Sequence, residues 1–153
     1  MRVWVWNLED DSDEIDRSLT ACRIHHGITQ EFCPGELFRD SGLDQRLCTA
    51  IEGRVEGFKI IEPVYESLRK EINERGIDVL TVDPFVKSHE VDENANSLID
   101  KIGARWKQLA HEIDIERLAH RNRRRTAEIR DLQPGIGAGA VLVFILSIGY
   151  YIT

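Results

Sequence analysis

Two short segments of the chain are apolar at nearly every position, and they constrain the fold more than any other feature. Residues 3–8 read Val-Trp-Val-Trp-Asn-Leu, and residues 77–82 read Ile-Asp-Val-Leu-Thr-Val. A strand with apolar side chains on both faces is buried on both faces, which is typical of parallel sheets in α/β proteins. Both segments are therefore predicted to be buried strands of a parallel sheet.

Amphipathic segments between and after the apolar runs predict helices. Asp11 and Glu14 have the spacing of a capping box at the start of the first helix, and glycines follow the first two helices, as at helix C-termini. The inward face of the first helix is expected to hold Ile15, Leu19, Cys22 and His26. The expected helices cover residues 11–27, 63–76 and 96–112, and weaker strands are expected at residues 37–39 and 113–119. This alternation predicts right-handed βαβ crossovers, so the expected fold class is α/β with a parallel sheet.

The length and charge of the chain limit the classes of protein to which it can belong. It has 153 residues, enough for one domain with a real core, and a net charge of −7. An acidic chain does not carry the broad positive footprint of a nucleic-acid-binding surface, although a local basic patch stays open. The first seven residues contain one basic residue and no long apolar stretch, so no secretory signal peptide is expected.

The last part of the sequence changes in character. Six arginines lie between Arg117 and Arg130, a Pro-Gly pair interrupts residues 126–135, and residues 136–152 contain no charged side chain. Seventeen apolar residues are at the lower limit for a helix that spans a bilayer, and the arginines before them would then face the cytoplasm. The alternative is a buried helix or a pair of strands within the α/β core. The chain is accordingly expected in the cytoplasm, or anchored in the inner membrane with its domain facing the cytoplasm.

An acidic residue follows each buried strand. Glu9 comes after the first strand and Asp83 after the second. Ligands of open α/β sheets bind beyond the carboxyl ends of the strands. Residues 79–83 also match a Walker B strand, in which the aspartate holds the Mg²⁺ that bridges the β- and γ-phosphates. The alternative for Asp83 is an ordinary Asp-Pro turn at the end of a strand.

Several short strings, taken in order, resemble one bacterial family. They are Val5–Asp10 with Glu14 and Arg17, Asp40–Gly42, Gly76–Val86 with Ser88 and His89, and Glu93–Asn96 with Ile99 and Asp100. The combination is similar to AAA-type, RecA-like P-loop ATPases related to plasmid replication helicases, over residues 1–125. The resemblance implies a RecA-like three-layer core that hydrolyses ATP with Mg²⁺.

The resemblance also implies roles for three residues. Glu9 takes the place of the glutamate that polarises the attacking water, and Asp83 takes the Walker B place as ligand of Mg²⁺. His120 matches the first histidine of a sensor segment that contacts the γ-phosphate at the end of the next strand, with an ordinary surface histidine as the alternative. After residue 125 the likeness stops.

One motif of the family is absent from the sequence. No Gly-x-x-x-x-Gly-Lys-Thr/Ser loop occurs anywhere in the chain, and that loop supplies most of the phosphate binding. We therefore expect an incomplete core with an exposed sheet edge, and no ATP hydrolysis by this chain alone. A truncated copy and the second half of a split ATPase, completed by a P-loop-bearing polypeptide, both fit this pattern.

Three functions follow as hypotheses. The first is an ATPase-family domain over residues 1–125, inactive or dependent on a complementing partner, and forming homo-oligomers as the family often does. The second is a non-catalytic binding module tethered to a membrane by residues 136–152. The third is a DNA-binding accessory protein that uses the arginines between Arg117 and Arg130.

Overall fold

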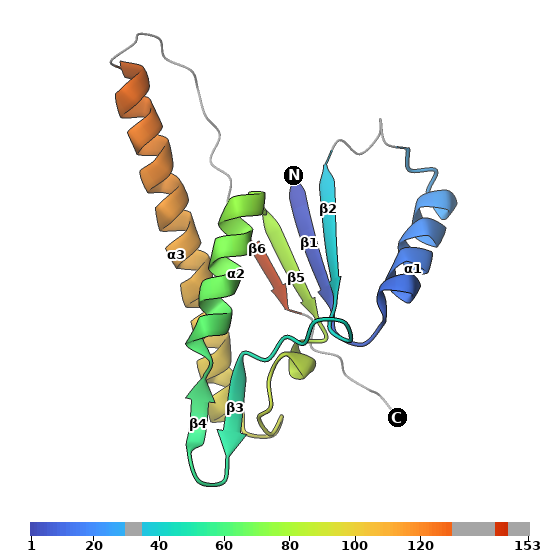
Figure 1. The fold of residues 1–153 in the computed structure, drawn as a ribbon, viewed down its shortest axis with the longest axis vertical. Coiled ribbons are helices and arrows are strands. Elements are labelled where there is room, and N and C mark those ends of the chain that lie inside the picture. The colour runs from blue at the N-terminus through green and yellow to red at the C-terminus, as the bar shows by residue number, and fades with distance from the viewer. Residues whose placement is uncertain (30–34, 130–142, 147–153) are drawn as a thin grey trace.

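The computed structural model describes residues 1–29, 35–129 and 143–146. Within them, four strands form a parallel sheet in the order β2-β1-β5-β6 (Figure 1). The bounds are Arg2–Asn7 for β1, Glu36–Ser41 for β2, Val79–Asp83 for β5 and Val143–Leu146 for β6. The parallel α/β class predicted from the two apolar runs is confirmed, because β1 and β5 are adjacent interior strands.

Strand β6 corrects two expectations. It pairs with β5 along the register Val79↔Val143, so the edge of β5 is covered, whereas an exposed sheet edge was expected without a strand being specified. Residues 143–146 are also extended, whereas an apolar helix was expected over residues 136–152; the rest of that segment lies outside the described residues. No helix in the described part of the chain is long and apolar enough to span a bilayer. An apolar run alone does not distinguish a strand from a helix, and here β5 offered a pairing edge.

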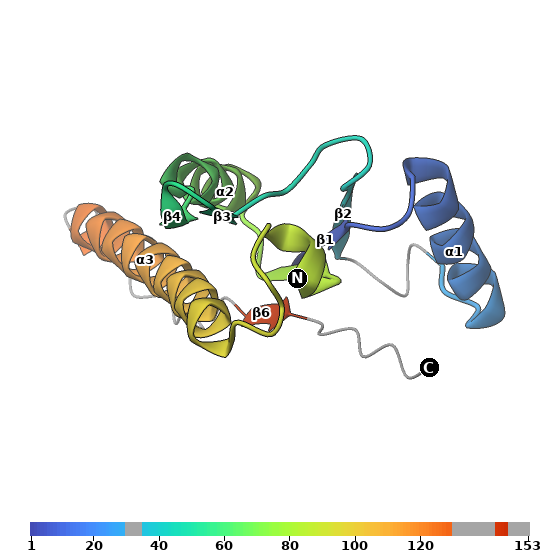
Figure 2. The same cartoon turned by 90° about the horizontal axis from the view of Figure 1, so that it is seen from below.

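Two helices cover one face of the sheet. They are α2 (Glu62–Arg75) and α3 (Asn96–Ile129), which lie together on one side in Figure 2. The core lies between them and the sheet, where Leu80, Ile72 and Trp106 are almost completely buried. Side chains on the other face of the sheet, including Val3, Val5 and Val79, are only half-buried. The described residues therefore complete two of the three expected layers.

Helix α1 (Ser12–His25) begins as predicted but packs less than predicted. The Asp11 side chain caps it by accepting a hydrogen bond from the Glu14 amide at 2.8 Å. Of the expected inward face, only Ile15 is buried, whereas Cys22 and His26 are exposed. The helix lies beyond β2 and away from the other helices (Figures 1 and 2). The helical spacing predicted which side chains of α1 share one face, but little of the described chain packs against that face.

Helix α3 is much longer than expected. The strand predicted over residues 113–119 is wrong, because one continuous helix runs from Asn96 to Ile129. Ile113 is fully buried one turn after Leu109, so it continues the helical stripe. Arg117 lies on the helix and donates a hydrogen bond to the Ile77 carbonyl oxygen, whereas its charge would disrupt a buried strand at this position.

A hairpin connects β2 to α2. Strands β3 (Ala50–Gly53) and β4 (Gly57–Ile60) pair antiparallel. The turn uses Gly57 at φ +69°, a conformation that glycine adopts without steric cost. A parallel bridge between Ile51 and Glu90 ties the hairpin to the segment after β5. This segment follows the short 3₁₀ helix η1 (Phe85–Ser88), and so it lies near the end of the sheet where β5 terminates.

Candidate functional site

Strands β1 and β5, whose ends carry the predicted acids, finish at the same level as the neighbouring strand β2. In the sheet register, Asn7 pairs with Ser41 on β2 and with Asp83 on β5. The segments that leave these strands therefore lie side by side. We call this region the carboxyl edge and define it as residues 7–10, 41–42 and 83.

Glu9 is fixed at the carboxyl edge by the backbone turn that contains it. The side-chain oxygen Oδ1 of Asn7 accepts hydrogen bonds from the amides of Glu9 at 2.8 Å and Asp10 at 2.9 Å. The Leu8 amide donates to the Asp83 carbonyl oxygen at 2.7 Å. Glu9 therefore lies just beyond the end of β1 and next to the end of β5. Its carboxylate is exposed, and its Oε1 lies 4.0 Å from Lys87 Nζ.

Asp83 ends β5, and its side chain is exposed. Within residues 1–29, 35–129 and 143–146, its carboxylate makes no hydrogen bond or ion pair. The next peptide bond, to Pro84, is cis. An exposed carboxylate at the end of an interior parallel strand is chemically able to coordinate Mg²⁺, which commonly uses one or two carboxylates together with phosphate and water.

Ser41 and Gly42 join the third strand to this edge. Ser41 is buried; its hydroxyl donates to the Asp10 carbonyl oxygen at 2.8 Å and accepts from the Leu43 amide at 3.1 Å. The Gly42 amide donates to the Asn7 carbonyl oxygen at 2.7 Å. These bonds make the loops after β1 and β2 one packed unit, so the backbone around Glu9 is held from two sides.

His120 is not brought to the carboxyl edge. It is exposed on α3, about 36 Å along the helix axis from Asn96 at roughly 1.5 Å per residue. One turn earlier, Arg117 contacts Ile77, which precedes β5. His120 therefore lies toward the amino ends of the strands, opposite to Glu9 and Asp83. The sequence argument failed because it assumed a strand whose end would carry the histidine.

Sequence reasoning did not single out Lys87, and it used His89 only as part of the family resemblance, without giving it a role. Lys87 is the one cation within 4.0 Å of a carboxylate of the carboxyl edge in the described chain. His89 is 7% exposed, and its Nδ1 has no hydrogen-bond partner among the described residues. Burial lowers the pKa of His89, and its ring contacts Phe85 edge to face at 5.3 Å. Both residues follow Asp83 within six positions, which is the signal that could have singled them out.

Few side chains at the carboxyl edge can act as metal ligands. Within the described ranges, no group of three or more His, Cys, Asp and Glu side chains converges as a metal cluster. Asp83 could act as a single protein ligand, with phosphate oxygens and water completing the shell of a magnesium ion. The edge can thus support metal binding only together with a phosphate group.

The fold and this edge define an α/β domain with carboxylates at the ends of adjacent parallel strands. A family model described as an AAA domain matches residues 1–122. The chain therefore belongs to the AAA domain family, which suggests nucleotide binding with Mg²⁺ in general. Neither curated proteins nor solved structures gave a match.

Proposed function

We propose that this chain is an ATPase-family domain that contributes the acidic half of an ATP site. In this proposal Asp83 is the ligand of Mg²⁺ and Glu9 polarises the attacking water. The single observation that carries the proposal is the adjacency of the two residues at the ends of β1 and β5, joined by the bond from the Leu8 amide to the Asp83 carbonyl oxygen. The family match over residues 1–122 supports the same class.

The phosphate-binding half is proposed to come from a second polypeptide. The printed sequence has no Gly-x-x-x-x-Gly-Lys-Thr/Ser loop, and the described carboxyl edge offers Lys87 as its nearby cation, already 4.0 Å from Glu9. Phosphate oxygens need several convergent donors. A P-loop-bearing partner would supply them, and a role related to replication helicases is the finer form of this proposal.

Metal binding at Asp83 is testable on the chain alone. We expect Mn²⁺ with ATP to broaden the backbone NMR signals of Asn7 and Leu8, because Asn7 pairs with Asp83 in the sheet and the Leu8 amide bonds to its carbonyl oxygen. The Asp83→Asn variant should lose this broadening, while Asp13→Asn, which removes an exposed acid on α1, should keep it. Broadening that persists unchanged in Asp83→Asn would show that the metal binds elsewhere.

Hydrolysis requires a different measurement. The chain alone should release no phosphate from Mg²⁺-ATP above the buffer rate. Mixed with a P-loop polypeptide that binds it, the wild-type chain should restore turnover, and Glu9→Gln should lower that rate by about 10²–10⁴-fold, the usual contribution of a positioned general base. Equal rates for wild type and Glu9→Gln would remove Glu9 from the reaction. Turnover by the chain alone, lost in Asp83→Asn, would show that no partner is needed.

A further inference from the structure

A cavity of about 840 Å³ lies between helix α1 and strand β2. Its volume falls within the range of ligand sites in proteins. The α1 wall includes Leu19 and Arg23, and the β2 wall includes Leu37. Figures 1 and 2 show α1 set apart from the sheet, beyond β2. None of the described residues that line this cavity belongs to the carboxyl edge, so it is a separate candidate site.

The β2 side of the cavity is the edge of a sheet. Within the described residues, β2 is a terminal strand and pairs with β1 alone. The Glu36 amide donates to the Met1 carbonyl oxygen at 3.2 Å. Backbone N–H and C=O groups alternate between the two edges of a strand, so those of Leu37 and Arg39 point away from β1. On that side they bond to no described residue.

The side chains of β2 leave this edge accessible. Leu37 is 51% exposed. The two charged side chains beside it are engaged, because Glu36 pairs with Arg2 at 2.6 Å and Arg39 pairs with Asp16 of α1. The strand contains neither lysine nor proline, which commonly protect such edges. A second chain can therefore approach the backbone of β2 from the cavity.

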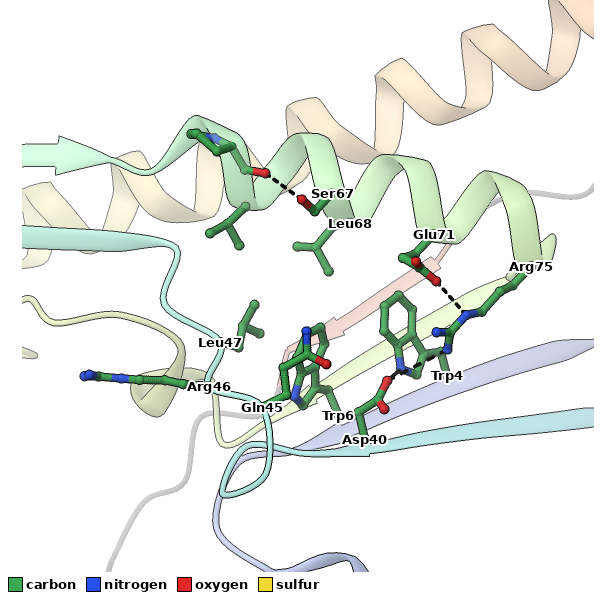
Figure 3. Close-up of a pocket in the computed structure, with 12 residues that line it drawn as sticks. Trp4, Trp6, Asp40, Gln45, Arg46, Leu47, Ser67, Leu68, Glu71 and Arg75 are labelled. Carbon is green, nitrogen blue, oxygen red and sulfur yellow. Dashed lines mark hydrogen bonds and ion pairs between the residues drawn. The ribbon is translucent and has the colours of Figure 1, made fainter.

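The opposite face of β2 is already filled. Figure 3 shows Asp40 bonded to the Trp4 indole, with Nε1 donating to Oδ2 at 2.7 Å. Arg75 of α2 covers the Trp4 ring at 4.9 Å and the Phe38 ring at 5.5 Å. A ligand in the cavity thus meets Leu37 and the outer edge of β2, and it does not need to reach the buried indoles.

Arg23 gives the cavity an uncompensated charge. It lies one turn after Leu19 on α1, so the two side chains share a face of the helix. The Arg23 side chain is exposed and forms no hydrogen bond or ion pair with a described residue. Glu36, the other charged residue of the lining, is paired with Arg2. An acidic group on a ligand would therefore be stabilised beside Arg23.

Two kinds of ligand combine an acidic group with apolar surface. The first is an alkyl carboxylate, whose chain would cover the outward N–H and C=O groups of Leu37 and leave them without partners, which is unfavourable. The second is an extended acidic peptide, whose own backbone supplies the matching donors and acceptors. The unpaired edge therefore favours the peptide.

We propose that the outer edge of β2 binds an extended segment of another protein as an added strand. One apolar side chain of the segment packs against Leu19 and Leu37, and a carboxylate two residues away, on the same face of the strand, pairs with Arg23. Backbone bonds to Leu37 and Arg39 supply affinity, and the cavity selects the side chains. The inference is independent of the proposed ATP site, with which it shares no residue.

The probe is the peptide acetyl-Thr-Val-Thr-Glu-Thr-amide, added to the full chain. It should slow hydrogen exchange of the Leu37 and Arg39 amides and shift their NMR signals in a saturable way, while Gly103 on α3 stays in place. A copy methylated on the nitrogens of valine and the next threonine, one of which must face β2, should bind at least about fivefold more weakly, as for one lost hydrogen bond. Octanoate should not protect either amide.

Two variants separate the backbone edge from the charge. Leu37→Pro removes the outward donor at a position where an edge strand tolerates proline, so it should abolish binding while circular dichroism stays unchanged. Arg23→Gln should weaken binding about twofold to fivefold, as for an exposed ion pair, and the exposed Arg54→Gln should not.

Three results would overturn the proposal. The first is unchanged exchange of the Leu37 and Arg39 amides at the highest soluble peptide concentration. The second is equal affinity for the methylated and unmethylated peptides, or equal protection by octanoate. The third is protection of the Leu37 amide that rises with protein concentration in the absence of peptide, which would identify a second copy of the chain as the occupant.

Discussion

Gly42 lies where the loops after β1 and β2 come into close contact. A Cβ atom at this position would lie 2.7 Å from the Leu8 Cα atom, and backbone cannot yield as a flexible side chain can. The Gly42 amide also bonds to the Asn7 carbonyl oxygen. The absence of a side chain here allows the loop that carries Glu9 to pack against β2.

Replacing Gly42 by alanine should therefore destabilise the fold. We expect Gly42→Ala to lower the free energy of unfolding by about 1–3 kcal/mol, the usual cost of overpacking, measured by urea denaturation. Gly103→Ala is the matched control, because nothing lies within 4 Å of its added Cβ atom. That substitution is within α3 and should stabilise by about 0.5–1 kcal/mol. Equal effects of the two substitutions would contradict the close approach.

His89 gives the protein a pH dependence with a definite sign. Burial lowers its pKa below the ordinary value of 6.5, so the folded state favours the neutral ring. As pH falls below about 6.5, the unfolded chain takes up the proton first, and the free energy of unfolding decreases. His89→Gln should flatten this slope in melting curves between pH 7 and pH 5. The exposed His111→Gln should leave it unchanged, and a slope that persists in His89→Gln would assign it to other groups.

Helices α2 and α3 are joined by an ion pair of favourable geometry. Arg105 donates to both carboxylate oxygens of Glu62, with N–O distances of 2.8–3.1 Å. Its guanidinium also lies 4.5 Å over the Tyr65 ring. The Arg105 side chain is 13% exposed and that of Glu62 is 54% exposed, so water screens the pair on one side.

This pair should show measurable coupling. Arg105→Lys removes the planar fork and should destabilise by about 1 kcal/mol, because a lysine cannot reproduce the bidentate contact. A double-mutant cycle with Glu62→Gln should give a coupling energy of about 0.5–1 kcal/mol by chemical denaturation. Strictly additive effects would mean that Arg105 acts through its other contacts, with Glu112 at 3.7 Å and with the Tyr65 ring, and not through Glu62.

Sequence reasoning predicted best the elements whose structure is indicated by their own residues and immediate neighbours in the sequence. The runs around Trp4 and Leu80 could only be buried strands, and Asp11 marked the start of α1 through its capping geometry. The hairpin was missed although Gly53 and Gly57 bracket its short turn. Strand β6 could not be predicted from its apolar residues, because its extended form depends on β5, a partner far away in the sequence.

The candidate site was predictable in part for the same reason. Parallel strands end at one edge, so Glu9 and Asp83 could be placed together from the pattern alone. Placing His120 correctly required knowing whether residues 113–119 form a strand or a helix. The buried positions Trp106, Leu109 and Ile113 follow helical spacing, which already favoured a continuing helix. The cavity between α1 and β2 depends on how α1 lies beside the sheet, which no local pattern specifies.

At the scale of the whole molecule, β6 protects the edge of β5. A chain shortened to residues 1–129 would expose the unpaired backbone groups of β5, and such edges pair with other chains. We expect this shortened chain to elute as larger, concentration-dependent species in size-exclusion chromatography, compared with the full chain at the same concentration. Identical elution of both chains would show that β5 is protected in another way. The homo-oligomeric, DNA-bound and membrane-bound states stay predictions.

The order of the strands also affects how the protein forms during synthesis. Strand β1 lies between β2 and β5, and Arg2 bonds to Asp78, a residue 76 positions later. At about 5–20 residues per second, translation leaves the tryptophans of β1 without their β5 neighbour for several seconds. Only β2 can pair with them in that interval. The nascent chain is therefore expected to be a chaperone client until β5 emerges from the ribosome.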